Sequence, residues 1–315
     1  MYIFKLNPVF KDYIWGGTKL RDEYGFESDL EKLAEGWMLS CHKDGENTIA
    51  NGEFSGKSLT EIIKANPDFL GENGKKFEYF PILIKLIDAK NDLSVQVHPD
   101  NEYAMRVEKE YGKTECWYIL DCDEGAELIY GFNREITSEE FKEKIADNSF
   151  LETVNKVKVK KGDLFFIEAG TLHAIGKGIL LAEIQQNSNT TYRVYDYGRL
   201  GADGKPRELH VEKAIDVTNC IPPVRSAEPE GDLVEYDNYS SQLLTKCDLF
   251  NVKKVNVKDF FDGVADKKSF VSVLVTDGNG TIDGIEIKKG DSLFVPAGYG
   301  TFTIKGNLEI IVTRV

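Results

Sequence analysis

Short apolar runs separated by glycine-containing turns dominate the hydrophobic pattern of this chain. In residues 157–170, Val157 and Val159 alternate with lysines, a Lys-Gly-Asp turn follows, and a second apolar run begins at Leu164. Alternation, a turn and another short apolar run are typical of an antiparallel hairpin. Further strands are predicted at 80–89, 93–99, 116–122, 126–132, 179–186, 191–198, 269–278 and 308–315. The pattern therefore predicts a mainly β protein.

Helical periodicity is confined to a few short segments. Ser58-Leu59-Thr60-Glu61 has the pattern of a capping box and predicts a helix that runs to residue 66. Asp100 is placed to cap a second helix, and Thr137 or Ser138 to begin a third that runs to residue 148. Residues 207–219 are helical by periodicity. Many short strands with a few peripheral helices predict an all-β sandwich or barrel of the jelly-roll kind.

One part of the pattern occurs twice along the chain. Residues 160–176 read KKGDLFFIEAGTLHAIG and residues 288–304 read KKGDSLFVPAGYGTFTI. Laid over each other without a gap, the copies share Lys-Lys-Gly-Asp, a Phe and Ala-Gly, but His173 in the first corresponds to Thr301 in the second. The proline-rich segment 221–232 is the best linker between the copies. We therefore expect two domains, residues 1–235 and 236–315.

Length and composition agree with this division. A chain of 315 residues is too long for one ordinary core, and 41% hydrophobic with 29% charged residues is typical of a soluble globular protein. The first twenty residues contain no apolar signal-peptide region, and no run approaches the roughly 18 apolar residues that a membrane helix needs. The five cysteines form no Cys-x-x-Cys pair. We expect a cytoplasmic protein, either a monomer or a weak homo-oligomer.

The formal net charge of −14 restricts the partners. A strongly acidic surface repels nucleic acid and anionic lipid, so neither is an expected partner. A small anionic ligand would need a local cluster of cations to overcome the general field.

The repeated segment resembles the second metal-binding motif of the cupin family, G-x5-P-x-G-x2-H. Residues 162–173 fit this motif with Glu168 in place of the proline, and residues 290–301 fit it with Thr301 in place of the histidine. The resemblance implies a bicupin, in which two cupin-like jelly-roll β-barrel domains follow each other and only the first binds metal.

Three further polar residues complete a ligand set around His173. Gln96 and His98 are two positions apart on a predicted strand, so both side chains lie on one face with Cα atoms roughly 6.5–7 Å apart. Glu115 precedes the strand at 116–122 and adds an anionic oxygen. Each residue alone would be an ordinary polar residue of a strand, but together they offer two nitrogens and two oxygens. This set suits zinc and would also accept iron, cobalt, nickel or manganese.

Longer motifs make the resemblance more specific. Q-V-H-P at 96–99, K-T-E at 113–115, G-T-L-H-A at 170–174 and T-Y-R-V-Y-D-Y-G-R at 191–199 resemble the type I mannose-6-phosphate isomerases (phosphomannose isomerases), in their short bacterial form. Segments 15–17 and 35–42 are similar to that family as well, so the resemblance extends over essentially the whole chain.

The resemblance implies both a ligand set and a reaction. It implies that one divalent ion per chain, with zinc as the first candidate, is held by Gln96, His98, Glu115 and His173. It also implies that the chain interconverts two sugar phosphates, mannose 6-phosphate and fructose 6-phosphate, through an enediol or enediolate.

Three basic residues are candidates for handling an anionic sugar phosphate. Lys85 is a cation inside an apolar strand, and Lys113 shares a strand face with Glu115 if that strand begins early. Arg193 matches an arginine that the resembling family is thought to use in catalysis, and its rigid fork suits a phosphate or an enediolate. We expect catalytic roles for Arg193 and Lys113, and substrate or phosphate binding by Lys85 and Arg193.

The general base stays open at this stage. A lysine whose pKa is lowered by a nearby cation and a metal-bound water are equal candidates. The resembling family often has an acid four residues before the arginine, where this chain has Asn189. His42 is expected to be structural or part of a pocket wall, and His210 to lie on the surface.

Two other classes of function remain as alternatives. A non-catalytic sugar-binding bicupin would not need Arg193 and Lys113. A metal-dependent cupin oxygenase more often has three histidine ligands, which a chain with only four histidines and a candidate Gln96 ligand does not favour.

Overall fold

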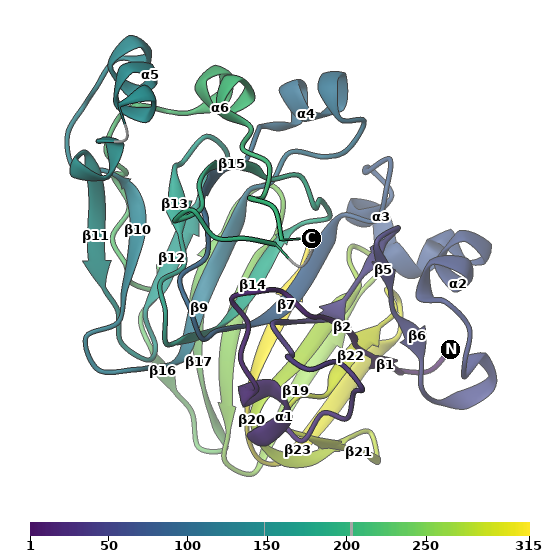
Figure 1. Ribbon diagram of the computed structural model, residues 1–315. Coiled ribbons are helices and arrows are strands. Elements are labelled where there is room, and N and C mark those ends of the chain that lie inside the picture. Colours follow the sequence, from purple (N-terminus) through teal and green to yellow (C-terminus); the bar gives the residue numbers. More distant parts are fainter. Residues whose placement is uncertain (148, 202–203) are drawn as a thin grey trace.

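The computed structural model describes residues 1–147, 149–201 and 204–315. Within these ranges the strands form antiparallel sheets of ten, six, five and two strands (Figure 1). The prediction of a mainly β protein is confirmed. None of these sheets closes on itself as a barrel within the described ranges.

The six-stranded sheet carries most of the site. Its order is β12 (Leu164–Ile167), β9 (Glu115–Cys122), β14 (Ile179–Gln186), β7 (Ile82–Ala89), β3 (Glu35–Leu39) and β2 (Val9–Lys11). Every residue of β7 and β14 is buried, which explains why both appear in the sequence as continuous apolar runs rather than as alternating ones. A charged residue inside either run is therefore a buried charge.

A five-stranded sheet lies next to it and a two-stranded ribbon lies apart. The five-stranded order is β11 (Val154–Lys158), β10 (Glu127–Phe132), β13 (His173–Ala174), β8 (Val95–Val97) and β15 (Tyr192–Tyr195). The ribbon pairs β4 (Cys41–His42) with β5 (Gly45–Glu46). As predicted, Val95 and Val97 are buried in an apolar cluster, since they face away from Gln96.

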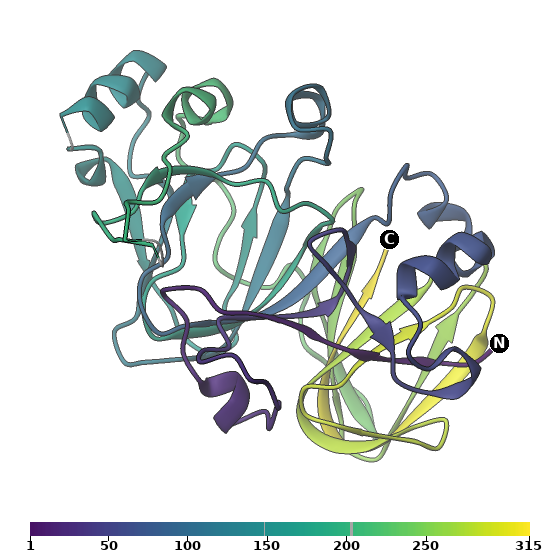
Figure 2. The ribbon, with the colours of Figure 1, turned by 45° about the vertical axis from the view of Figure 1, so that its right-hand side comes forward.

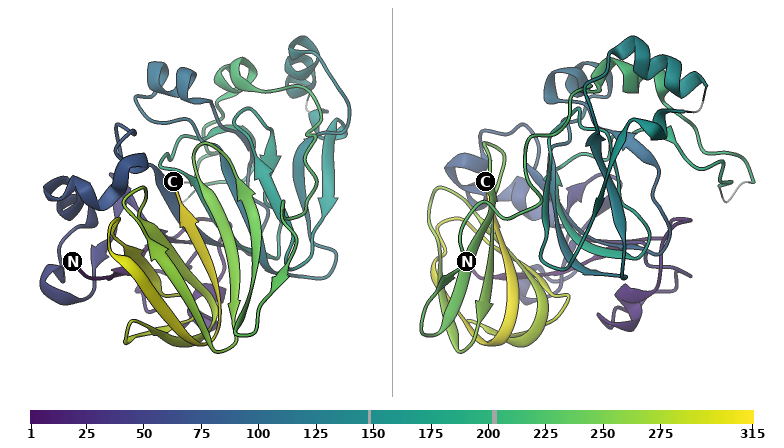
Figure 3. Two further views of the ribbon diagram at one scale, coloured as in Figure 1. Left: turned by 180° about the vertical axis from the view of Figure 1, so that it is seen from behind. Right: turned by 90° about the vertical axis from the view of Figure 1, so that its left-hand side faces the viewer.

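The C-terminal third supplies most of the ten-stranded sheet. Its path runs β16 (Val234–Glu235), β17 (Tyr239–Lys246), β18 (Asn251–Val257), β23 (Gly300–Arg314), β20 (Val271–Ile282), β22 (Ser292–Val295), β1 (Phe4–Asn7) and β6 (Thr48–Ile49), with β19 (Phe260–Ala265) and β21 (Ile285–Lys288) at its side. The two large bodies of strands lie side by side, as two further views show (Figure 3).

The N-terminal strand belongs to this C-terminal sheet. Strand β1 runs alongside the strands of the C-terminal part (Figure 2) and pairs with β22, with Phe4 opposite Phe294. The rings of these two residues stack with their centres 6.0 Å apart. One core cluster contains Phe4 and Phe294 together with side chains of β7, β9 and β14, so the two large sheets share a core. Sequence patterning did not anticipate this pairing, and the division at residues 235 and 236 stays a prediction.

The helices are short and peripheral. The α4, α5 and α6 helices gather at one end of the molecule, whereas α2 and α3 lie beside the ten-stranded sheet (Figures 1 and 2). The helical elements are α1 (Lys19–Asp22), α2 (Leu59–Ala65), α3 (Gly71–Gly74), α4 (Asn101–Val107), α5 (Ser138–Ala146), α6 (Val211–Val217), η1 (Gly52–Phe54), η2 (Pro67–Leu70) and η3 (Phe150–Glu152).

The predicted caps are present at three helices. The side chains of Ser58, Asp100 and Thr137 each accept a hydrogen bond from a backbone N–H of the first turn that follows. The helix predicted over 207–219 is shorter in the structure, where only α6 (Val211–Val217) is helical. Residue 148, where the third helix was predicted to end, lies outside the described residues.

The two copies of the repeated segment fold the same turn. Gly162 and Gly290 have φ of 93° and 90°, in the region that favours glycine. The carboxylates of Asp163 and Asp291 accept the backbone N–H three residues earlier, at 2.9 and 2.8 Å. Strands β12 and β22 then follow. The shared residues therefore specify a turn, as the pattern predicted.

Candidate metal centre and substrate pocket

Three residues that the sequence singled out as ligands meet in the interior. His98 follows β8, Glu115 begins β9, and His173 begins β13 directly opposite Gln96 of β8. One ligand atom from each of His98, Glu115 and His173 lies within 4.8 Å of the other two, and all three residues are buried. Strands of two different sheets thus bring together residues that are far apart in the sequence.

The two imidazoles present lone pairs to each other. Nδ1 of His98 lies 2.9 Å from the carbonyl oxygen of Thr190, and Nδ1 of His173 lies 2.8 Å from that of Thr171. Because a carbonyl oxygen only accepts, each Nδ1 carries the proton and each Nε2 is an acceptor with a lone pair. The two Nε2 atoms are 3.1 Å apart. Two acceptors at that distance need a cation or a donor between them.

The carboxylate of Glu115 fits the same ion. Its Oε1 is fully buried, has no hydrogen-bond partner in the described part of the chain, and lies 3.9 and 3.7 Å from the Nε2 atoms of His98 and His173. A buried carboxylate oxygen without a partner is costly unless a cation compensates it. The cluster could therefore hold a divalent metal.

Gln96 lies at the edge of this cluster. Its amide nitrogen is 3.4 Å from Nε2 of His173, and its amide oxygen is 3.4 Å from the hydroxyl of Ser94. To contribute to a cation site, the amide would have to turn its oxygen towards the histidines, which a rotation of the amide group allows.

Burial keeps both histidines neutral. It lowers the pKa of His98 well below its usual range, with the Lys113 ammonium adding to the effect, and it lowers the pKa of His173 to about 4. Neutral imidazole is the form that binds metal ions. The two histidines are therefore in the protonation state that metal binding requires at neutral pH.

Lys113 adjoins the cluster, although not in the way that the sequence suggested. Strand β9 begins at Glu115, so the strand does not start early and Lys113 lies in the loop before it. Its ammonium nevertheless lies 2.5 Å from Oε2 of Glu115, 3.1 Å from Nε2 of His98 and 3.7 Å from Oε1 of Glu183. The loop rather than a shared strand face places this lysine.

A cavity of about 270 Å³ adjoins the cluster, because Gln96 and Lys113, which contact the cluster, line it. Its lining includes Gln96, Lys85, Lys113 and Arg193, all of which the sequence singled out. It also includes residues that sequence reasoning did not assign: Tyr13, Trp15, Glu35, Ile87, Leu93, Ser94, Ile175, Glu183, Thr191 and Arg207. The cationic cluster that an anionic ligand would require on this acidic protein is therefore present.

Lys85 is a buried cation between two carboxylates. Its ammonium lies 3.4 Å from Oε2 of Glu35, 3.3 Å from Oε1 of Glu183, and 5.3 Å from the centre of the Trp37 ring. Burial alone would lower the pKa of Lys85, but the two carboxylates outweigh it and the net effect raises the pKa. Lys85 is therefore charged and faces the pocket.

Glu183 is a functional candidate that the sequence analysis missed. It lies on β14 opposite Lys85 and Trp117, and its Oε2 accepts a hydrogen bond from the indole N–H of Trp117 at 2.9 Å. Burial would raise its pKa, but Lys113 and Lys85 outweigh burial and lower it, so the group is an anion. An acid inside the apolar run 179–186 is the same signal that drew attention to Lys85, and it could have identified Glu183.

Two arginines lie on one side of the pocket. Arg193 is opposite Gln96 in the sheet, and its guanidinium donates to Ser94 Oγ at 3.3 Å and to the Glu208 carbonyl at 2.8 Å. Nε of Arg207 donates to Asp196 at 2.7 Å. Arg207 had no signal of its own, because it belongs to the segment that sequence reasoning assigned to a helix.

The remaining polar residues fall into three places. Asn189 lines the pocket and donates from its amide to Asp44 at 2.9 Å. His42 is buried outside this pocket and lines a larger one, in agreement with a wall role. His210 is half-buried rather than fully on the surface, and its Nδ1 accepts the backbone N–H of Arg193 at 3.3 Å.

The second copy of the repeat shows no comparable cluster. Thr301 is exposed on β23, and in residues 1–147, 149–201 and 204–315 the cluster around His173 is the one group of three or more His, Cys, Asp or Glu residues placed to hold a metal. None of the described helices is long and apolar enough to cross a bilayer.

A buried histidine–carboxylate cluster beside a cationic pocket, in a mainly β scaffold, is typical of the metal-dependent enzymes of the cupin class. Residues 3–149 match the catalytic domain of type I phosphomannose isomerases, and residues 240–315 match the cupin domain of mannose-6-phosphate isomerases. A Bacillus subtilis protein named probable mannose-6-phosphate isomerase GmuF is 42% identical over 318 residues, covering 98% of both chains. The chain belongs to the type I phosphomannose isomerase family.

Two further comparisons agree. Mannose-6-phosphate isomerase ManA of Bacillus subtilis is 42% identical over 315 residues, covering 98% of this chain and 97% of its own. A crystal structure of a mannose 6-phosphate isomerase from Bacillus subtilis superposes with a TM-score of 0.92 at 38% identity, covering 100% of both chains. The resemblance drawn from the sequence motifs is thereby confirmed.

Proposed function

We propose that this chain is a metal-dependent aldose–ketose isomerase that interconverts mannose 6-phosphate and fructose 6-phosphate through an enediol or enediolate. The observation that carries this proposal is the His98–Glu115–His173 cluster beside a pocket lined by lysines, arginines and a buried carboxylate. Family membership supports the same reaction.

One divalent ion, with zinc as the first candidate, would be held by His98, Glu115 and His173, with Gln96 as a fourth ligand. When bound, such an ion supplies Lewis-acid stabilisation of charge on the sugar oxygens. The Nδ1–H groups of the two histidines, each donated to a backbone carbonyl, hold the rings in the orientation that directs both Nε2 atoms to one point.

Proton transfer at carbon falls to Glu183 in this proposal. The reaction moves a carbonyl between C1 and C2, so a base must remove a carbon-bound proton and return it to the neighbouring carbon. Glu183 is an ionised carboxylate that lines the pocket, and its Oε1 is 3.7 Å from Lys113, which in turn contacts Glu115. Lys113 is placed to stabilise the negative charge that develops on the substrate oxygen.

We propose Arg193 as the phosphate-binding residue, and Arg207 lines the same pocket. The sequence had also indicated Lys85 for this role. Arginine forks bind phosphate through two parallel hydrogen bonds. Lys85 is already held between Glu35 and Glu183, which favours Arg193 for the phosphate and leaves Lys85 to hold the Glu183 carboxylate as an anion.

The arrangement of domains is also proposed. The shared turn supports a bicupin of two cupin-like jelly rolls, residues 1–235 and 236–315, of which the second has no metal role. A cytoplasmic monomer or weak homo-oligomer agrees with the free state of all five cysteines and with the acidic charge, which disfavours nucleic acid and anionic membranes as partners.

A coupled assay for fructose 6-phosphate formed from mannose 6-phosphate tests the function. It compares metal-loaded protein, chelator-treated protein, His173→Ala, and Thr301→Ala as the matched change in the second copy. We expect activity only in the loaded wild-type protein and in Thr301→Ala. A folded, metal-loaded protein without turnover would overturn the proposal and favour the sugar-binding alternative.

A further inference from the structure

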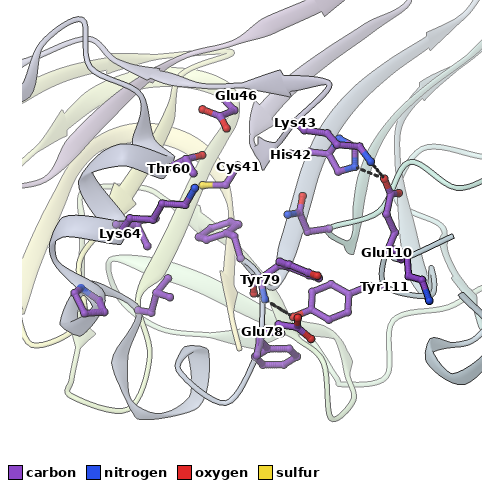
Figure 4. Close-up of a pocket in the computed structure, with 17 residues that line it drawn as sticks. Cys41, His42, Lys43, Glu46, Thr60, Lys64, Glu78, Tyr79, Glu110 and Tyr111 are labelled. Atoms are coloured by element: carbon purple, nitrogen blue, oxygen red, sulfur yellow. Dashed lines mark hydrogen bonds and ion pairs between the residues drawn. The ribbon is translucent and has the colours of Figure 1, made fainter. Parts of the chain in front are cut away.

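Glu110 lies at the edge of a second pocket, outside the proposed active site. This pocket has a volume of about 500 Å³, and its lining combines charged residues with aromatic ones, among them Phe77, Phe80 and Tyr111. Figure 4 shows Glu110 at one side of it, pointing towards His42 and Lys43. Glu110 comes from the loop between α4 and β9, and the reaction proposed above does not use it.

One oxygen of Glu110 faces the side chains of Lys43 and His42. Its Oε1 lies 2.5 Å from the ammonium of Lys43 and 3.6 Å from Nε2 of His42. The hydrogen bond from His42, against the opposing effect of burial and with help from Lys43, lowers the pKa of Glu110 to about 2. The carboxylate is therefore ionised and anchored on this side.

The other oxygen of Glu110 holds the segment that leads to the metal cluster. Its Oε2 accepts from the hydroxyl of Thr190 at 3.3 Å and from the backbone N–H of Asn189 at 3.4 Å. These two residues lie between β14 and β15, outside the sheet ladders. Side-chain contacts must therefore fix their position, and Glu110 supplies two of them.

Thr190 connects this segment to His98. Its carbonyl oxygen accepts the Nδ1–H of His98 at 2.9 Å. The partner of one imidazole nitrogen sets the ring orientation, and so sets where the lone pair of the other nitrogen points. A displacement of the Thr190 carbonyl would turn Nε2 of His98 away from Glu115 and His173.

We propose that Glu110 is a positioning residue of the metal centre, which acts through Thr190 to hold the His98 imidazole in its ligating orientation. This inference rests on the metal role proposed above for His98. Replacing a direct outer partner of a metal-bound histidine typically weakens metal binding 10–100-fold. Glu110 is one contact further out, so we expect a smaller loss for Glu110→Ala, about 3–10-fold, below that range.

The test uses Co²⁺ as the probe and measures two quantities on the intact chain: its dissociation constant, by competition with a chelator, and its visible absorption spectrum. Glu110→Ala and Thr190→Val should both weaken Co²⁺ binding and change the spectrum. Thr190→Ser, which keeps the hydroxyl, should restore wild-type behaviour. Because both changes act on one path, the double variant should lose less than the product of the two single losses.

Two comparisons keep the outcomes separate. Glu102→Gln removes an exposed charge from the neighbouring helix α4 and should change neither quantity. If His98→Ala leaves Co²⁺ affinity unchanged, the proposed metal site itself fails. The positioning role is overturned if His98→Ala abolishes Co²⁺ binding while Glu110→Ala and Thr190→Val bind it as the wild type does. It is also overturned if the loss of Co²⁺ affinity in the double variant equals the full product of the two single losses. Should Glu110→Ala fail to fold, Glu110→Gln and Thr190→Val decide the question.

Discussion

Glu183 is an acid in an apolar strand, held as an anion by two ammonium groups. If it exchanges the carbon-bound proton, Glu183→Gln should lower kcat by about 10²–10⁴, the usual contribution of a general base. The amide has the same shape and can still accept from Trp117, so KM and metal content should change little. Steady-state kinetics with a metal assay checks this, with Glu124→Gln on the surface as control. A kcat within a few-fold of wild type would return the base role to Lys113 or to water.

Glu110 also makes the stability of the protein depend on pH. Its pKa falls to about 2 in the folded state, from 4.5 as an ordinary carboxyl, so the unfolded chain binds more protons between these values. The contribution of Glu110 is therefore complete above about pH 4.5 and is lost as the pH falls towards 2. The free energy of unfolding, measured with urea, should fall less from pH 6 to pH 3.5 for Glu110→Gln than for the wild type or Glu102→Gln. Equal differences in all three would contradict the ionised role of Glu110.

At the scale of single residues, sequence reasoning anticipated which side chains come together where a residue type has few chemical uses in its setting. His98, Glu115 and His173 were identified because histidines are scarce in this chain and a motif pointed to the last of them. Arg207 was not identified, because its neighbours in the sequence give no sign that folding brings this arginine to a pocket. Asn189 illustrates the same limit, since its amide contact with Asp44 joins two segments remote in sequence.

The repeated turn shows what a hairpin of this kind requires. Gly162 and Gly290 share nearly the same φ, but a Cβ on Gly162 would meet nothing within 4 Å, whereas one on Gly290 would lie 2.7 Å from Cζ of Phe26. Gly162→Ala should therefore cost about 1–3 kcal/mol of unfolding free energy from backbone strain alone. Gly290→Ala should cost more, because the Phe26 ring must move as well. Urea unfolding of the two variants measures the difference. Equal losses of unfolding free energy would show that the Phe26 ring moves aside without cost.

At the scale of elements, prediction was good for strands and helix starts and poorer for helix length. Caps are local, so Ser58, Asp100 and Thr137 could be read from a few neighbouring residues. The segment 207–219 has helical periodicity throughout, but its first residues leave the helix because Arg207 pairs with Asp196 and Glu208 gives its carbonyl to Arg193. Tertiary contacts there override the local preference.

For the molecule as a whole, the shared core predicts that both sheets unfold together. All three tryptophans, Trp15, Trp37 and Trp117, belong to the N-terminal part of the chain. Phe294→Ala removes a buried ring from the C-terminal part and should cost about 3–5 kcal/mol. The urea midpoint of tryptophan fluorescence should shift accordingly, while exposed Val264→Ala should leave it in place. An unmoved fluorescence transition for Phe294→Ala would show that the two parts unfold independently.

The large-scale plan was predicted only in outline. The linker at 221–232 stays a prediction. The repeated turn is a local feature, and it was visible in the sequence. The pairing of Phe4 with Phe294 was not, because an isolated apolar strand at the start of a chain carries no sign of which sheet edge it will join.

That pairing has a consequence for synthesis on the ribosome. Strand β1 is made first, but β22, its partner, follows only after most of the chain has been translated. At usual elongation rates, β1 emerges roughly 15–60 s before that partner exists. During this interval its apolar residues and unpaired backbone groups are open to other nascent chains. Chaperones that bind extended segments would therefore bind β1 during this interval.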